Sequence, residues 1–417
     1  MQLRVSFVIL AAVTTIITSV FYVLVILQIA VGLYSLWRGI EWFRFVRRRL
    51  VSHAGFYAPV AAVICPCKGN ELGLEDNLTA LTRFDYADYE VYFSLATSLD
   101  PALKVIERVK AASKRPVHIV IAGPPENCGE KVYNLRRAVE ALPEKFEVIA
   151  FTDSDVRLSR NWLGKIVAPL QDSRLGATTT YRWFIPSRSF GSGGFASALA
   201  SAWNASVATL LGGSRENFCW GGGTAIRRKT FDDAQVLEAW NGAVSDDYAM
   251  TTALIQAGKQ IMFCPECLAV TLHPWTGTEL FSFTNRQVLI TRVYSPHRWL
   301  TGVLAHLSYS FTLVYAAFTV IFLMLDDDPW GQLALLTLVI LLLAAMKGAI
   351  RTMAVNELLP EWKARLQEWG WVWLGLAPVV PFLFSWNFLV SLLTRRILWR
   401  GVHYELVSPS VTRILPR

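Results

Sequence analysis

Four long stretches without a charged residue constrain this chain more than any other feature of its sequence. They cover residues 5–37, 299–325, 329–346 and 369–394. A membrane-spanning helix needs about 20 apolar residues in a row. The first, second and fourth stretches are therefore long enough to cross a bilayer, and the third is close to the lower limit. Because only 17% of all residues are charged, the sequence predicts an integral, multi-pass membrane protein.

The first stretch is typical of an anchor, because its apolar core is far longer than the roughly 7–15 residues of a cleaved signal sequence. Five basic residues follow it closely, with only Glu41 against them: Arg38, Arg44, Arg47, Arg48 and Arg49. Basic flanks favour the cytosolic side of a membrane. The net charge of +8 fits loops that face anionic lipid, so we expect the bilayer, and no nucleic acid, as a partner.

The end of the chain leaves two interpretations open. Four crossings would place both chain ends outside the cytosol, whereas Arg395, Arg396 and Arg400 favour the cytosolic side. Either the segment around Pro378–Pro381 enters the membrane without crossing it, or the tail breaks the charge rule. The expected organisation is an anchor over 1–37, a cytosolic domain over 38–298, a membrane region of about three spans over 299–394, and a basic tail over 395–417.

The cytosolic region alternates short apolar strands with amphipathic helices. We expect strands at 60–66, 89–96, 117–122 and 146–152, with helices at 74–82, 101–112 and 131–142. This order predicts a mostly parallel α/β sheet. Ligands bind such sheets at the carboxyl ends of the strands, so polar side chains that follow a strand are the candidates for a functional site.

Two acidic motifs lie at such positions. Asp153 and Asp155 follow the fourth strand, where a turn would let both approach one divalent cation that bridges a diphosphate; the alternative is a helix cap. Asp246 and Asp247 precede an amphipathic segment. They are either acids in the first turn of a helix or the site of a general base that takes a proton from an incoming hydroxyl.

Other residues fit a nucleotide site or an ordinary surface equally well. Gly221–Gly223 precede a short apolar strand and would allow a ligand close to the backbone, or simply form a tight turn. Lys68 ends the first strand, and Lys131 and Asn134 open a helix. Each is a possible nucleotide contact or a solvated side chain.

Taken together, the motifs resemble the inverting glycosyltransferases of family 2 and, more closely, the ceramide glucosyltransferases of family 21. The resemblance covers about residues 55–300 and the membrane layout, and it implies a GT-A-type (Rossmann-like) domain. It is carried by Pro66-Cys-Lys-Gly69, Leu99-Asp-Pro-Ala102, Lys131-Val-Tyr-Asn-Leu135, Asp153-Ser-Asp155 and Ser245-Asp-Asp-Tyr-Ala-Met250.

The resemblance implies a role for each motif. Asp153, with Asp155, would bind Mg²⁺ or Mn²⁺ and the diphosphate of a UDP-sugar, and Asp247 would be the catalytic base with Asp246 beside it. Nucleotide contacts would come from Lys68, Lys131 and Asn134.

The chain departs from the family pattern at two places. The uridine-binding acid of the family aligns with Thr97, and Asp100 is the nearest acid. Of the family's RxxRW box the chain keeps Arg286, whereas Leu289 and Ile290 replace the second Arg and the Trp. Arg292, or the pair Arg298-Trp299, is the candidate to replace them.

The resemblance implies that a hexose, which is glucose in the ceramide glucosyltransferases, is transferred with inversion from a UDP-sugar to a ceramide-like lipid hydroxyl. The motifs do not distinguish ceramide from diacylglycerol, a hopanoid-type lipid or a carotenoid. A catalytically inactive membrane protein that kept the fold is the alternative from another class. The two intact acidic motifs argue against it, and the altered box makes a processive polysaccharide synthase a poorer fit.

Overall fold

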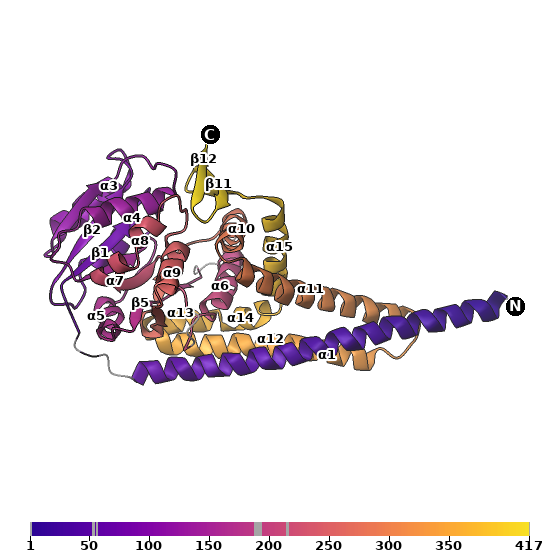
Figure 1. The fold of residues 1–417 in the computed structure, drawn as a ribbon. Helices are drawn as coiled ribbons and strands as arrows, with labels where there is room; N and C mark the ends of the chain where they lie inside the picture. The colour runs from indigo at the N-terminus through magenta and orange to yellow at the C-terminus, as the bar shows by residue number, and fades with distance from the viewer. Residues whose placement is uncertain (1, 52–54, 56, 187–193, 214–216, 417) are drawn as a thin grey trace.

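The computed structural model describes residues 2–51, 55, 57–186, 194–213 and 217–416. An α/β domain lies at one end, and long apolar helices extend away from it (Figure 1). Residues 1 and 417, which begin the expected anchor and end the expected tail, lie outside the described residues.

Seven strands of the described chain form the main sheet, in the order β3-β2-β1-β4-β7-β5-β8. β1 pairs in parallel with β2 and β4, β2 pairs in parallel with β3, and β5 in parallel with β8. β7 runs antiparallel to both of its neighbours. The predicted mostly parallel sheet is confirmed. The bounds are β1 Ala61–Pro66, β2 Tyr89–Leu95, β3 Val117–Ile121, β4 Val148–Thr152, β5 Leu175–Thr179, β7 Gly223–Arg227 and β8 Gln260–Phe263.

Helices cover both faces of this sheet, which explains why β1 is apolar at every position. Ala61, Val63 and Cys65 pack in a core with α2 and α3, whereas Ala62 and Ile64 pack with α4 and α9. A strand buried on both faces is expected to be continuously hydrophobic. The bounds are α2 Leu74–Leu81, α3 Ala102–Ala112, α4 Glu130–Glu140, α5 Trp162–Val167, α7 Arg228–Asp233, α8 Val236–Ala239 and α9 Asp246–Gln256.

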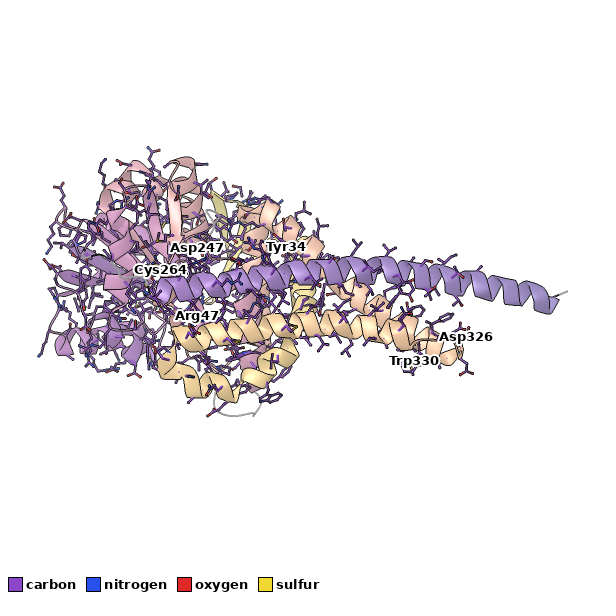
Figure 2. All side chains as sticks on the ribbon, turned by 90° about the horizontal axis from the view of Figure 1, so that it is seen from below. Tyr34, Arg47, Asp247, Cys264, Asp326 and Trp330 are labelled. Atoms are coloured by element: carbon purple, nitrogen blue, oxygen red, sulfur yellow. The ribbon has the colours of Figure 1, made fainter. Side chains whose placement is uncertain are left out.

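In the part of the chain that the structure describes, three helices are long and apolar enough to cross a membrane. They are α1 Gln2–Val51, α11 Pro296–Leu325 and α12 Gly331–Leu358. α1 lies along α12 in both views (Figures 1 and 2). The fourth apolar stretch is not one straight helix, since α14 Gly370–Leu376 and α15 Val380–Leu393 form a pair bent by 56°. The bend falls at the prolines where the sequence indicates a possible re-entrant segment.

Two further helices lie between the sheet and the long apolar helices α1, α11 and α12, which we refer to as the membrane helices (Figure 1). α6 Gly194–Ala208 is rich in small residues and is mostly buried against α14, α15 and α10. α10 Gly277–Tyr294 starts with a capping box, in which Thr276 and Glu279 each satisfy a backbone N–H of the other. The shorter elements are β6 Arg182–Phe184, β9 Ala269–Thr271, α13 Lys363–Glu368, and one-turn helices at 168–171, 265–267 and 360–362.

The basic tail folds into a small antiparallel sheet of β10 Arg396–Trp399, β11 Val402–Ser408 and β12 Val411–Leu415. This sheet lies against the α/β domain (Figure 1). The Tyr404 hydroxyl accepts a hydrogen bond of 3.2 Å from the Glu130 backbone N–H. The Ser410 carbonyl oxygen comes so close to Gly242 that a Cβ atom there would lie 1.9 Å from it. The tail sheet therefore packs on the α/β domain.

Candidate active site

A cavity of about 1490 Å³ opens at the carboxyl ends of β1 and β4 and continues to the membrane helices. Its polar end is lined by Lys68, Asp153 and Asp155 together with Asp246 and Asp247. Its other end is lined mainly by apolar and aromatic side chains, with the residues Trp203, Phe218, Gly302, Ala305, Phe384 and Phe388. The structure thus brings both acidic motifs predicted from the sequence into one cavity.

Asp153 and Asp155 follow β4, and each carboxylate is paired with a cation. The Lys131 Nζ atom lies 2.7 Å from Asp153 Oδ1, and Arg182 Nη1 lies 3.0 Å from Asp155 Oδ2. Burial opposes ionisation of Asp155, but the positive charges of Arg182, Arg400 and Lys131 outweigh it and lower the pKa of its carboxyl. Asp155 is therefore placed to carry negative charge in the cavity.

Lys131 joins the two acidic motifs. Besides Asp153, its ammonium contacts Asp246, with Nζ 3.2 Å from Oδ1. Burial disfavours the charged ammonium, yet Asp153 and Asp246 raise the pKa of Lys131. For Asp246 the balance is reversed: burial and the charges of Asp247 and Asp153 outweigh Lys131 and raise the pKa of Asp246 to about 6. Lys131 is thus a structural partner of the acids as well as a possible nucleotide contact.

Asp247 lies in the first turn of α9, and its carboxylate both organises the helix start and lines the cavity. Its Oδ1 atom accepts hydrogen bonds from the Ser245 hydroxyl and, at 2.8 Å, from the Tyr248 backbone N–H. Asp246 is 4% exposed, whereas Asp247 is only partly buried. Of the two acids, Asp247 is therefore the more accessible to a bound molecule.

Gly221 makes room for the contact between Lys131 and Asp246. A Cβ atom on Gly221 would lie 2.2 Å from Asp246 Oδ2 and 2.7 Å from Lys131 Nζ. We expect Gly221→Ala to lower the activity of the enzyme by about a hundredfold, because small displacements of catalytic groups have effects of that size. The matched control is Gly277→Ala, since a Cβ atom there meets nothing within 4 Å. Equal activity of the two variants would contradict a tight fit at Gly221.

The acids after β4 suit a divalent cation that is coordinated by both protein carboxylates and the oxygens of a diphosphate. Among the described residues, no three His, Cys, Asp or Glu side chains gather into a group that could hold a metal ion by themselves. Asp155 Oδ1 is buried and has no hydrogen-bond partner within the described chain. Mg²⁺ is commonly bound by one or two carboxylates and substrate phosphates, and Asp153 with Asp155 can supply that pair.

The remaining predicted nucleotide contacts lie in different places. Lys68 lines the cavity and pairs with Glu130 at 2.8 Å. Asn134 also lines it, and its buried Oδ1 atom has no partner among the residues described. Asp100 is turned to the backbone instead, where its Oδ1 accepts from the N–H groups of Gly69 and Ala102 at 2.8 and 2.9 Å. It therefore fixes the loop that carries Lys68 and the start of α3.

Of the arginines proposed around the altered box, two reach the cavity. Arg286 lines it, and burial together with Arg182 and Arg400 lowers the pKa of Arg286 to about 10. Arg298 lines it too, with its guanidinium 5.5 Å from the Phe218 ring centre. Arg292 lies apart from the lining residues: it donates to the Ser391 carbonyl and stacks over Trp299.

Sequence reasoning missed Arg182, which pairs with Asp155, and Arg400, which lines the same cavity and pairs with Glu71. Arg182 comes from β6, a short strand whose partner β9 lies far along the chain. Arg400 comes from the tail sheet. Neither residue is part of a local motif, so only the folded structure brings them to the acids.

Two glycosyltransferases are among the solved structures that resemble this chain. A mannosyltransferase from Pyrobaculum calidifontis, solved with GDP-mannose and Mn²⁺, has a TM-score of 0.45 and 16% identity over 88% of this chain and 99% of its own. A GalNAc-T7 structure with UDP, GalNAc and Mn²⁺ has a TM-score of 0.38 and 14% identity over 61% of this chain and 52% of its own. At these TM-scores neither similarity carries an argument about the site.

The sequence itself gives the decisive comparison. No curated protein matches the chain. The model of glycosyl transferase family 21 matches residues 20–410, which include the sheet, the cavity and the membrane helices. The predicted α/β fold, with a mostly parallel sheet and apolar helices before and after the domain, is confirmed. The chain belongs to glycosyltransferase family 21.

Proposed function

We propose that this enzyme transfers a hexose, most simply glucose, from a UDP-sugar to the hydroxyl of a ceramide-like lipid, with inversion. The observation that carries the proposal is the continuity of the cavity. Its acidic end lies at the strand ends of the α/β domain, and its apolar end is lined by α11 and α15. A lipid can thus bring its hydroxyl to Asp247 while its hydrocarbon chains remain in the bilayer.

In this mechanism Asp247 accepts the proton of the lipid hydroxyl as the oxygen attacks the anomeric carbon. Ser245 and Tyr248 orient the carboxylate through their hydrogen bonds. The attack comes from the face opposite the leaving diphosphate, so the configuration inverts. The cations Lys131 and Arg182 stabilise the negative charge that develops on the diphosphate. A divalent cation bound by Asp153 and Asp155 would neutralise further charge there.

The lining of the apolar end favours a ceramide-like acceptor over a carotenoid. Ser206, Thr301 and His306 lie among its aromatic side chains. These side chains can hydrogen-bond the amide and the second hydroxyl of a ceramide, groups that a carotenoid does not carry in that arrangement. Diacylglycerol and a hopanoid-type lipid are the alternatives: alkali treatment of the labelled product separates the first from ceramide, and its mobility on the thin-layer plate separates the second.

The same layout supports a cytosolic position for the domain. Arg47, at the domain end of α1, lies far from Asp326 and Trp330 in the turn between α11 and α12 (Figure 2). Basic residues at the domain end favour the cytosol. Because the tail sheet packs on the domain, we infer three full crossings and a re-entrant α14–α15 pair.

A protease site added after the tail should be cut in sealed vesicles only from the cytosolic side, and cleavage from the other side would contradict this topology.

The proposal is tested by incubating purified protein with radiolabelled UDP-sugars, a total lipid extract and Mg²⁺ or Mn²⁺, followed by thin-layer chromatography of the extracted lipids. We expect label from UDP-glucose in a lipid that resists mild alkali, as a sphingolipid does. A labelled lipid that alkali destroys would identify a glycerolipid acceptor. If folded protein labels no lipid with any nucleotide sugar, the inactive homologue becomes the better interpretation.

A further inference from the structure

The tail sheet places Trp399 and Arg400 in the lining of the cavity that also contains the acids after β4. Trp399 pairs with Val402, so Arg400 and Gly401 form a two-residue turn between β10 and β11. Their φ angles are 49° and 77°, which is typical of a type I′ turn, where Asn-Gly is the favoured pair. An arginine in left-handed backbone is strained. Strain at a residue whose side chain enters a cavity points to a function of that side chain.

The contacts of Arg400 orient its guanidinium along the cavity wall. Its Nη1 atom lies 2.6 Å from Glu71 Oε1 and donates a 3.0 Å hydrogen bond to the Lys68 carbonyl oxygen. Both partners belong to the loop that follows β1. Arg400, Arg286 and Arg182 all line the cavity, and Arg182 pairs there with Asp155 of the predicted diphosphate site.

The altered box explains how the tail comes to lie there. Leu289 and Ile290, which stand where the family has Arg and Trp, are 2% and 4% exposed. They pack in one apolar cluster with Ile397, Tyr404 and Leu406 of the tail sheet. The substitutions thus form the surface on which the tail sheet rests. The tail adds the Trp399 indole and the Arg400 guanidinium to the cavity lining. The Trp399 ring centre lies 5.2 Å from the Arg286 guanidinium.

We propose that Arg400 binds the diphosphate of the donor nucleotide, and that the tail sheet is a built-in part of the donor site. The proposal rests on the proposed function, because it assigns a ligand to the same cavity. Arginine suits this role since its planar guanidinium can donate two parallel hydrogen bonds to phosphate oxygens. Trp399 packs beside Arg286 and holds the turn against the cavity wall.

The test compares the binding of UDP and of uridine, each with Mg²⁺, to the wild-type protein and to Arg400→Asn. Asn-Gly is the preferred type I′ pair, so this variant should fold with an equal or higher melting temperature. We expect its affinity for UDP to fall by about tenfold or more, as for loss of a charge-assisted hydrogen bond, while its affinity for uridine stays unchanged. Arg396→Gln is the matched control: Arg396 is an exposed residue of β10, and the control should bind both molecules as the wild type does.

Two outcomes would overturn the proposal, and they are distinguishable. If the wild type prefers UDP to uridine and Arg400→Asn keeps that preference in full, Arg400 does not bind the diphosphate, although the proposed function stands. If the wild type itself binds UDP no better than uridine, the donor site of the proposed function is wrong, and the role of Arg400 falls with it.

Discussion

Asp247→Asn is expected to abolish sugar transfer, with a loss of about a thousandfold or more, while the binding of the nucleotide sugar is preserved. The amide oxygen can still accept hydrogen bonds from Ser245 and the Tyr248 backbone, so the start of α9 should keep its shape. The amide cannot take up the proton of the attacking hydroxyl, and loss of a general base has effects of this size. The measurement is the initial rate of labelled-lipid formation, together with calorimetric binding of UDP.

Asp232→Asn is the matched control for this variant. Asp232 lies at the exposed end of α7 and pairs with Arg228 one helical turn away, so its loss should leave the rate unchanged. Full activity of Asp247→Asn would move the base role to another carboxylate, and Asp246 would be the next candidate. Loss of UDP binding in Asp247→Asn would instead mean that the acid organises the donor site.

Lys131→Met is expected to have the largest effect on stability, about 3–5 kcal/mol, as for removal of one partner from a buried ion pair. The ammonium contacts both Asp153 and Asp246, and without it these carboxylates repel each other in a buried site. The pKa of Asp246, already raised to about 6, should then rise further. An acid whose pKa is raised on folding stabilises the fold at low pH and loses that contribution as the pH rises through the raised value. The variant should therefore unfold more easily at pH 7 than at pH 5.

This second prediction is checked by thermal unfolding in detergent between pH 5 and pH 8. Lys229→Met is the matched control, because the Lys229–Asp233 pair is exposed and such pairs contribute little. Adding Asp246→Asn to Lys131→Met should recover part of the lost stability, since it removes one of the unpaired charges. A Lys131→Met protein as stable as the wild type at every pH would contradict the central place of this lysine.

The sheet and the acidic motifs were predictable because their signals are local. β1 is a short apolar run and β4 is apolar up to Thr152, and Asp153 and Asp155 follow β4 directly. The parallel arrangement then brings strand ends to one edge of the sheet. The ion pair between Lys131 and Asp246 was not predictable, because it depends on α4 and α9 meeting across more than a hundred residues of sequence.

The role of the tail could not be read from its composition. Its basic residues suggested a charged end, although Tyr404 and Leu406 alternate with the more polar His403 and Glu405 as in a strand with one buried face. That alternation predicts a strand, but not where the strand docks. The tail sheet packs on Leu289 and Ile290, and its Ser410 carbonyl oxygen lies close to Gly242. These are long-range contacts, so only the folded chain reveals that Arg400 enters the cavity.

Asp100 and Arg292 show a second limit of sequence reasoning. Either side chain could bind a ligand or serve the fold, and both make backbone contacts in the structure. Asp100 supports the loop after β1, and Arg292 ties α10 to the end of α15. Their roles in nucleotide binding stay predictions that the geometry does not favour.

The most direct test of the account is transfer in vesicles that contain the purified protein and defined lipids. Labelled UDP-glucose is added outside, with ceramide either present in the bilayer or replaced by a water-soluble alcohol. We expect label to enter the organic phase only when the lipid acceptor is present, and we expect Asp247→Asn to prevent this. Transfer to the soluble alcohol or to water as fast as to any lipid would show that the cavity does not connect the donor site to the membrane, and would contradict the proposed function.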